Sequence, residues 1–161
     1  MKILQVYRTY FPDTQGGVEE VIRQIAIGVK RSGGECRIII PTKKTKKIEC
    51  IVIGGIKVFR VPEIIELASC NMFAKGFSKF HELVGWADVV HYHFPWPFQD
   101  IMHASLPKKL RGETKFIATY HADIVKQQFL LKLYNPLMHW FLGQMDLIVA
   151  SSTNYSQSSL V

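Results

Sequence analysis

The chain has 161 residues, of which 48% are hydrophobic and 20% are charged. This length allows one sizeable hydrophobic core and predicts one domain, and the composition excludes an intrinsically disordered chain. The formal net charge of +7 favours anionic partners, such as a nucleotide, a phosphorylated substrate, an acidic membrane surface or nucleic acid. Charge alone does not rank these partners.

Cysteine usage and the apolar segments indicate the cellular setting. The three cysteines, Cys36, Cys50 and Cys70, are odd in number and include no Cys-x-x-Cys pair, which argues against a disulfide framework and a zinc site. The chain begins directly with a strand pattern, and its most apolar stretch, Phe129 to Ala150, is interrupted by charged residues. We therefore expect a cytoplasmic protein, with peripheral contact as its one mode of membrane association.

The first part of the chain predicts a strand, a helix and a second strand. Apolar residues run almost continuously from Ile3 to Tyr7 and from Cys36 to Ile40, as is typical of strands buried on both faces of a parallel sheet. From Val18 to Lys30 the apolar residues recur every three or four positions, which predicts one face of an amphipathic helix. Gly33 comes just after this helix, where glycine commonly ends a helix. Pro41 ends the second strand.

Gly16 and Gly17 lie between the first predicted strand and the first predicted helix. Because glycine has no Cβ, an anion can approach the backbone closely, and a helix start adds unpaired N–H groups and a positive dipole end. The pair is therefore a candidate phosphate contact. Two glycines also serve simply to turn the chain, and the dinucleotide fingerprint of three spaced glycines is absent. Both interpretations remain open.

Lysines concentrate in the next segment, at Lys43, Lys44, Lys46 and Lys47, either as a solvated loop or as a contact for an anionic surface. Beyond it we expect Glu49 to Ile53 and Lys57 to Val61 to form an antiparallel hairpin or two short strands at a sheet edge. A mixed helical region from Ile64 to Val84 and a strand from Ala87 to His93 follow. Then follow a proline loop (Phe94 to Pro97), a helix (Gln99 to Leu110), a strand (Lys115 to Thr119), a helix bent at Pro136 (Ile124 to Leu142) and a strand (Leu147 to Ala150).

Strands that alternate with helices predict an α/β fold with a Rossmann-like, doubly wound, mostly parallel sheet. Ligands of such sheets bind beyond the carboxyl ends of the strands. This rule collects Gly16-Gly17, His93, His121 and Ser151 on one rim. The rim is therefore where we look for a site.

His121 follows a predicted strand end, where an imidazole can donate a hydrogen bond to a ligand hydroxyl or stabilise a developing charge. The alternative is a histidine bonded to backbone. Lys126, close in sequence, is either a phosphate partner or a solvated lysine at a helix start. His91 and His93 share one side of a strand, but their spacing suggests no third metal ligand, so packed rings are the commoner outcome.

Aromatic residues and missing motifs narrow the function classes. Trp96 and Phe98 flank the proline loop and suit either stacking on a ligand or packing onto the body of the protein. Ser151-Ser152 lacks the Gly-x-Ser-x-Gly elbow of hydrolases, and no phosphate-loop motif occurs. No nucleic-acid-binding module is recognised, so we expect no nucleic-acid partner.

Five segments in order, Tyr10–Asp13, Gly16–Glu19, Ala87–His93, Thr119–His121 and Asp146–Ser152, resemble the N-terminal half of family 4 glycosyltransferases. These are retaining enzymes of the GT-B fold, in which two Rossmann-like domains face each other across a cleft. The resemblance covers essentially the whole chain. It implies that residues 1–161 form the acceptor-side N-terminal domain and that the donor-binding C-terminal domain is absent from this chain.

The resemblance also implies roles for particular residues. His121 matches the family histidine that contacts the transferred sugar, and Gly16 and Gly17 would give backbone access to the donor diphosphate or the acceptor. Tyr10 and Lys126 match positions on the acceptor side, and His93 lies on the same substrate-binding rim. The family's front-face mechanism, in which the donor phosphate takes the acceptor proton, implies neither a metal nor a cofactor beyond the nucleotide-sugar substrate.

Two departures from the family pattern limit the function of the chain by itself. The two spaced glutamates of the family's C-terminal domain have no counterpart here, and Val21 stands where members often carry a basic residue. The leading hypothesis is therefore half of a hexosyltransferase, nearly inactive alone, with a nucleotide sugar and a sugar or lipid-linked acceptor as partners. The alternative is a stand-alone module that binds phosphorylated ligands or an anionic membrane surface.

Overall fold

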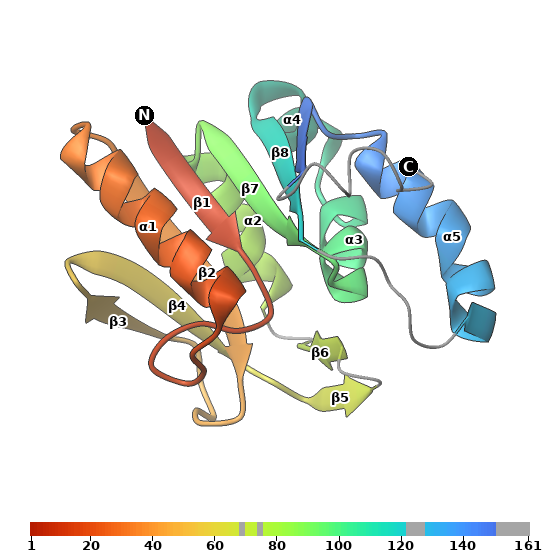
Figure 1. Cartoon of the computed structure of the whole chain (residues 1–161), viewed down its shortest axis with the longest axis horizontal. Coiled ribbons are helices and arrows are strands. Elements are labelled where there is room, and N and C mark those ends of the chain that lie inside the picture. Colours follow the sequence, from red (N-terminus) through yellow and green to blue (C-terminus); the bar gives the residue numbers. More distant parts are fainter. Residues whose placement is uncertain (68–69, 74–75, 122–127, 151–161) are drawn as a thin grey trace.

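The structure is a computed structural model that describes residues 1–67, 70–73, 76–121 and 128–150. Within these ranges seven strands form one sheet in the order β3-β4-β2-β1-β7-β8-β9 (Figure 1). Neighbouring strands run parallel, except that β3 and β4 form an antiparallel hairpin at one edge. The strands are β1 (Lys2–Val6), β2 (Glu35–Thr42), β3 (Glu49–Ile53), β4 (Ile56–Pro62), β7 (Val89–Phe94), β8 (Lys115–Tyr120) and β9 (Leu147–Ala150).

Helices cover both faces of this sheet, which confirms the predicted doubly wound α/β architecture. Helix α1 lies in front of β1 and β2 in Figure 1, whereas α2 and α3 lie behind the sheet. The described helices are α1 (Gly17–Arg31), α2 (Phe77–Trp86), α3 (Pro97–Ala104), α4 (Lys108–Glu113) and α5 (Gln128–Leu142).

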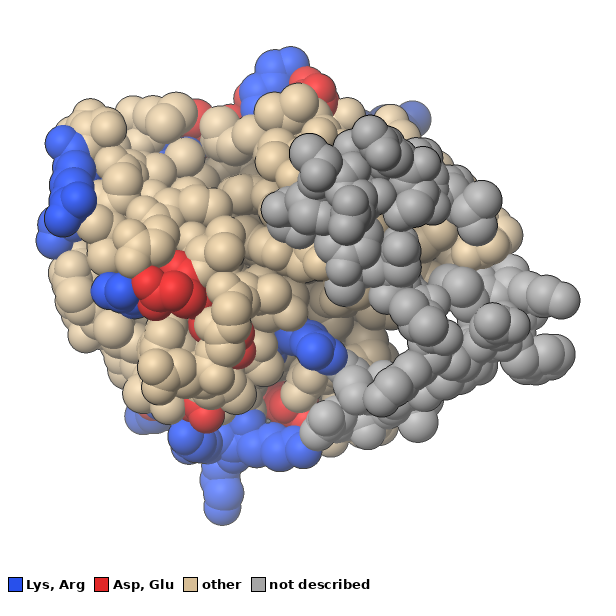
Figure 2. All heavy atoms as spheres, in the orientation of Figure 1, with Lys and Arg blue, Asp and Glu red and all other residues tan. Residues whose placement is uncertain are grey.

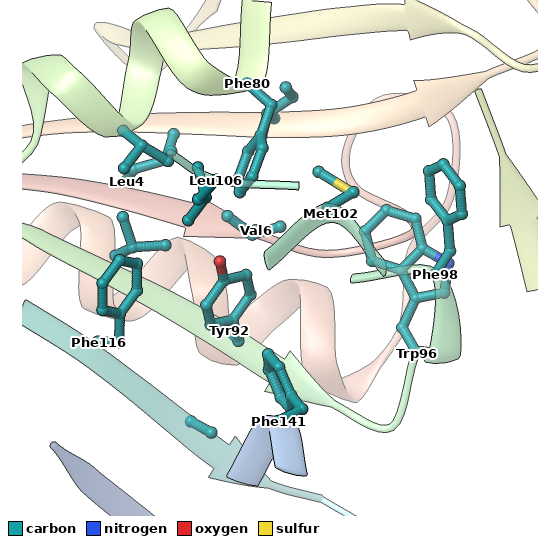
Figure 3. Close-up of a cluster of buried hydrophobic side chains, with 14 of the residues drawn as sticks. Leu4, Val6, Phe80, Tyr92, Trp96, Phe98, Met102, Leu106, Phe116 and Phe141 are labelled. Atoms are coloured by element: carbon teal, nitrogen blue, oxygen red, sulfur yellow. The ribbon is translucent and has the colours of Figure 1, made fainter. Parts of the chain in front are cut away.

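Two hydrophobic clusters hold the layers together, one on each face of the sheet. Under α1, Ile22 and Ala26 pack against Ile38 and Val58 of the strands. The larger cluster on the opposite face joins β1, β7 and β8 to α2, α3 and α5. Figure 3 shows part of it, with labelled side chains Leu4, Val6, Phe80, Tyr92, Trp96, Phe98, Met102, Leu106, Phe116 and Phe141. Burial of apolar surface on both faces accounts for the continuous apolar runs in the strands.

The predicted hairpin is confirmed, including its place at a sheet edge. Gly54 and Gly55 form the turn, and both have positive φ angles, 59° and 77°. Residues with a Cβ rarely adopt that conformation, so the two glycines fix the register in which Ile53 faces Ile56.

The prediction of mixed helix from Ile64 to Val84 is wrong for its first part. Two short strands, β5 (Ile65–Leu67) and β6 (Cys70–Met72), pair there in a separate antiparallel sheet, and among the described residues of this stretch only those of α2 are helical. Distant contacts hold this sheet: the Trp96 indole donates to the Asn71 carbonyl at 3.1 Å, and the Asn71 amide donates to Glu63 at 2.7 Å. Strands of three residues are too short to give a periodic pattern.

Two prolines change the predicted boundaries after β7. The expected loop from Phe94 to Pro97 reduces to two residues, because Phe94 ends β7 and Pro97 begins α3. The first helical residue needs no N–H donor, so proline is tolerated there. The single helix expected from Gln99 to Leu110 is in fact α3 and α4, because Pro107 lacks the N–H that a continuous helix would need.

The remaining elements match their predictions to within one or two residues, including β1, α1, β8 and β9. Pro136 lies inside α5 as expected. The predicted start of that helix at Ile124, and Ser151 of the predicted rim, lie outside the described residues.

Candidate functional site

The carboxyl ends of two neighbouring parallel strands, β7 and β8, bring two histidines together. His93 lies one residue before the end of β7, and His121 directly follows β8. The ladder continues one residue past β8, because the His121 N–H donates to the Phe94 carbonyl at 3.0 Å. The sequence-based expectation that both histidines share a rim is therefore confirmed.

A chain of close side-chain contacts runs from β1 to His121. His93 Nε2 lies 2.7 Å from Gln5 Oε1, and His93 Nδ1 lies 2.9 Å from His121 Nε2. Gln5 and His93 are both fully buried. The three residues meet because side chains alternate along a strand: Gln5 and His93 point away from the large cluster that contains Leu4, Val6 and Phe94. We call Gln5, His93 and His121 the histidine chain.

The neighbouring His91 completes the polar layer on this face of the sheet. Its Nε2 lies 2.7 Å from Thr119 Oγ1, and its ring centroid lies 4.4 Å from that of His93. Within the described ranges, no group of three or more His, Cys, Asp or Glu side chains has the arrangement of a metal site. The two rings bind other protein groups.

Burial keeps the rings of this layer neutral. It lowers the pKa of His91 to about 4 and that of His93 well below its usual value, and it lowers the pKa of His121 as well. The mutual repulsion of the charged rings adds to the effect for His91 and His93. A neutral imidazole has one N–H donor and one acceptor nitrogen. Since His121 Nε2 faces His93, its Nδ1 is the ring nitrogen left for a ligand.

Gly16 and Gly17 have different surroundings. Gly16 is the N-cap of α1 with an extended backbone (φ −160°), and a Cβ on it would come within 2.7 Å of Glu19 Oε2. At Gly17, apart from its two chain neighbours and the backbone of its own helix, no atom of the described residues lies within 4 Å of the position of a Cβ. The Glu19 carboxylate, which accepts a hydrogen bond from Thr14 Oγ1 at 2.8 Å, therefore lies close to the N-cap, and the open approach is at Gly17.

Sequence reasoning missed Glu19, although a signal was present. A glutamate three residues after the N-cap is the position from which a carboxylate reaches back to the helix start. Glu19 is buried. Its negative charge complements the helix dipole and competes with an external anion at Gly16.

The aromatic candidates are part of the core. The Tyr10 ring, proposed for the acceptor side, is 1% exposed and packs edge-on against Phe11 with ring centroids 5.3 Å apart. Burial raises the pKa of Tyr10 to about 12. Trp96 and Phe98 are buried as well, which supports packing of the proline loop over stacking on a ligand. The Tyr10 ring offers a ligand almost no surface.

A hollow of about 170 Å³ opens where the loop after β1 meets the end of β2. Asp13 lies in its wall and is bonded to Arg60 Nη2 at 2.9 Å and to the Thr42 hydroxyl, with Lys44 Nζ 3.3 Å away. Burial alone would raise the pKa of Asp13, but these three partners together lower it. The lining residues are Arg8, Thr9, Asp13, Thr14, Pro41, Thr42, Lys43, Lys44, Glu63 and Asn71.

Charged groups of this hollow were not singled out from the sequence, apart from the two lysines. Arg60 also binds Glu49 at 2.8 Å, and the Glu63 side chain is only 3% exposed, with Lys43 Nζ 3.5 Å from its Oε1. The side chains of Lys43 and Lys44 remain 66% and 59% exposed. Figure 2 shows basic side chains along the border where the loop between β2 and β3 lies in Figure 1. Lys126 lies outside the described residues.

The described part of the chain contains no helix that is long and apolar enough to cross a membrane. This agrees with the interrupted apolar pattern in the sequence.

Comparison with known proteins gives the family. The sequence profile of Glycosyltransferase Family 4 matches residues 15–157. The O-antigen chain mannosyltransferase C of Escherichia coli is 40% identical over 161 residues, an alignment that covers 99% of this chain and 42% of the relative. A D-rhamnosyltransferase of Pseudomonas aeruginosa is 41% identical over 160 residues and is covered to 40% of its length.

Solved structures share the fold at low sequence identity. An α-glucosyltransferase in complex with UDP superposes with a TM-score of 0.56 at 16% identity, covering 99% of this chain and 37% of that chain. A trehalose-6-phosphate protein of Escherichia coli, bound with UDP-2-fluoro glucose, gives 0.53 at 12% identity, covering 98% and 41%. At this level of identity the likeness shows a shared fold.

The chain spans about two-fifths of the length of the curated relatives that it matches. Within that span the alignments leave almost no residue of the chain uncovered, and the histidines at the strand ends fall inside the matched region. The chain belongs to Glycosyltransferase Family 4.

Proposed function

We propose that the chain forms the acceptor-side half of the active-site cleft of a retaining glycosyltransferase. The full enzyme would transfer a hexose from a nucleotide sugar to a sugar or lipid-linked acceptor, and a second domain would bind most of the donor. The observation that carries the proposal is His121, anchored at the end of β8 by the histidine chain. Alone, the chain would be nearly inactive, because catalysis needs both walls of the cleft to hold donor and acceptor in register.

The roles of the residues follow from their surroundings. His121 would orient the transferred sugar through Nδ1, and Gly17 would let a ligand approach the start of α1. The hollow around Asp13 and Glu63 offers carboxylate, amide and hydroxyl groups to an acceptor. We assign no general base and no metal to this chain, because in front-face transfer the donor phosphate accepts the proton of the attacking hydroxyl.

The relatives support the class of donor and acceptor. Their names describe transfer of mannose and of D-rhamnose, one of them into an O-antigen chain, so we propose a hexose or deoxyhexose donor and a saccharide acceptor. Neighbouring structures contain UDP or a UDP-sugar. One of them also contains a 13-mer DNA, which weakens our expectation that the chain has no nucleic-acid partner.

Replacement of His121 tests the proposed function. In an assay of sugar transfer by the full enzyme, we expect His121→Ala to lower turnover about a hundredfold or more, because an oriented donor at the reacting sugar is lost. The control is His139→Ala, which removes an exposed histidine of α5. Transfer by His121→Ala within a fewfold of the unmodified enzyme would refute the assigned role.

Peripheral binding to an anionic membrane is the second candidate function, favoured by the exposure of Lys43 and Lys44. We expect the chain to sediment with vesicles that contain acidic lipids at low salt and to be released by modest salt, because exposed charges are screened. Substitution of Lys43, Lys44, Lys46 and Lys47 by glutamine should abolish this binding. Equal sedimentation with neutral vesicles would contradict a charge-driven contact.

A further inference from the structure

The buried Gln5 amide contains an unpaired group that bears on His121. In the arrangement with Gln5 Oε1 facing His93 Nε2, the amide nitrogen of Gln5 is buried and has no hydrogen-bond partner among the residues that the structure describes. Both amide N–H groups are then unpaired. Turning the amide by 180° pairs one N–H with His93 and leaves the second N–H and the carbonyl unpaired, in place of two unpaired N–H groups. Buried carbonyls are left unpaired more often than buried N–H groups, so the turned amide is the more favourable one.

The direction of the amide fixes the direction of the next two hydrogen bonds. If the Gln5 nitrogen donates to His93 Nε2, neutral His93 must carry its proton on Nδ1. That proton is then donated to His121 Nε2 across the 2.9 Å contact. His121 Nε2 becomes an acceptor, and neutral His121 must carry its own proton on Nδ1. The opposite amide orientation would reverse each step and leave Nδ1 as an acceptor.

We propose that Gln5 and His93 are positioning residues that fix the tautomer of His121, so that the ring presents an N–H donor at Nδ1. Neutral rings are required, and the burial that lowers the pKa of all three histidines on this face supplies that condition. The stacked rings of His93 and His121, 5.2 Å apart with an angle of 18° between planes, hold the orientation. Only the link to catalysis rests on the proposed function.

Nuclear magnetic resonance measures the tautomer directly. In a long-range ¹H–¹⁵N spectrum of the labelled chain at neutral pH, we expect His93 and His121 each to carry the proton on Nδ1. His121 is identified by the signals that disappear in His121→Gln. A proton on His121 Nε2 would overturn the proposal, and this test needs no other variant to fold.

A variant pair tests whether Gln5 sets the tautomer. Gln5→Leu removes the amide, and we expect His121 to change from one tautomer to a mixture of both. The matched control is Gln99→Leu, which makes the same change at another fully buried glutamine whose side-chain amide has no hydrogen-bond partner among the described residues. His121 should keep its single tautomer in the control. If His121 also keeps the Nδ1 proton alone in Gln5→Leu, Gln5 does not set it.

Transfer assays separate this proposal from the proposed function. We expect Gln5→Leu to lower turnover of the full enzyme about tenfold or more, since a wrong tautomer misdirects the ring. If the tautomer is as proposed but His121→Ala transfers normally, the histidine chain stands and the catalytic role fails. If His121→Ala is inactive but the proton lies on Nε2, the catalytic role stands and the positioning role fails.

Discussion

At the scale of single residues, the neighbouring Gly16 and Gly17 differ in how much open space lies beside the backbone. Neither residue has a positive φ angle, so backbone conformation does not require glycine at either position. Glu19 lies close to Gly16, whereas the space beside Gly17 is open. The open position is therefore the one where an added methyl group would report on ligand approach.

Gly17→Ala tests this directly. We expect the free energy of unfolding to stay within about 0.5 kcal/mol of the original or to rise slightly, because alanine is a better helix former than glycine. Sugar transfer should fall about tenfold or more, since the methyl group blocks approach to the backbone. Gly28→Ala is the control: it lies in the same helix, also in open space, and should stabilise by roughly 0.5–1 kcal/mol without affecting transfer. Unchanged transfer in Gly17→Ala would remove Gly17 from the binding surface.

At the scale of elements, a charged cluster joins the loop after β1 to β2, β3 and β4. Arg60 on β4 binds both Asp13 of the loop and Glu49 of β3, and its side chain is only 11% exposed. Thr42 and Lys44, at the end of β2 and just after it, bind Asp13 as well. Asp13, Thr42 and Lys44 also line the hollow, so this cluster shapes its wall and holds the loop after β1 against the sheet.

Removal of the Arg60 guanidinium should therefore destabilise the folded chain. We expect Arg60→Met to lower the free energy of unfolding by about 2–4 kcal/mol, because it leaves the largely buried carboxylate of Asp13 with weaker compensation. Denaturation by urea measures the change. In Arg23→Met the lost ion pair with Glu20 is exposed, and the cost should stay below about 1 kcal/mol. Similar costs for the two variants would contradict a structural role of the cluster.

At the scale of the whole molecule, the buried histidines make stability depend on pH. Burial lowers the pKa of His91 and of His103 to about 4, and it lowers that of His93 well below its usual value. In the unfolded chain these groups titrate near 6.5. Below that pH the unfolded chain binds protons that the folded chain excludes, so stability present above about pH 6.5 is lost as the pH falls toward 4. Asp100, whose pKa burial raises to about 8, acts in the opposite direction.

The three buried histidines together change stability with pH more than Asp100 does, so acidification should destabilise the folded chain. We expect the free energy of unfolding to fall by several kcal/mol between about pH 7 and pH 4.5. Urea denaturation followed by circular dichroism at a series of pH values measures the slope. His91→Gln should make the slope shallower, while His139→Gln, at an exposed position, should leave it unchanged. Stability that rises on acidification would show that the buried rings are not neutral.

The sequence by itself determined the sheet, the alternation of strands and helices, and the rim on which His93 and His121 lie. Periodicity reports which face of each element is buried, and parallel strands share one carboxyl edge, so these features are local in origin. Tertiary structure decided the rest. The pairing of β5 with β6, the Asp13–Arg60 ion pair and the contact of Gln5 with His93, 88 positions apart, depend on distant segments meeting. Periodic patterns in a sequence do not show which distant segments come into contact. The residues proposed to orient His121 can therefore be identified only in the folded chain.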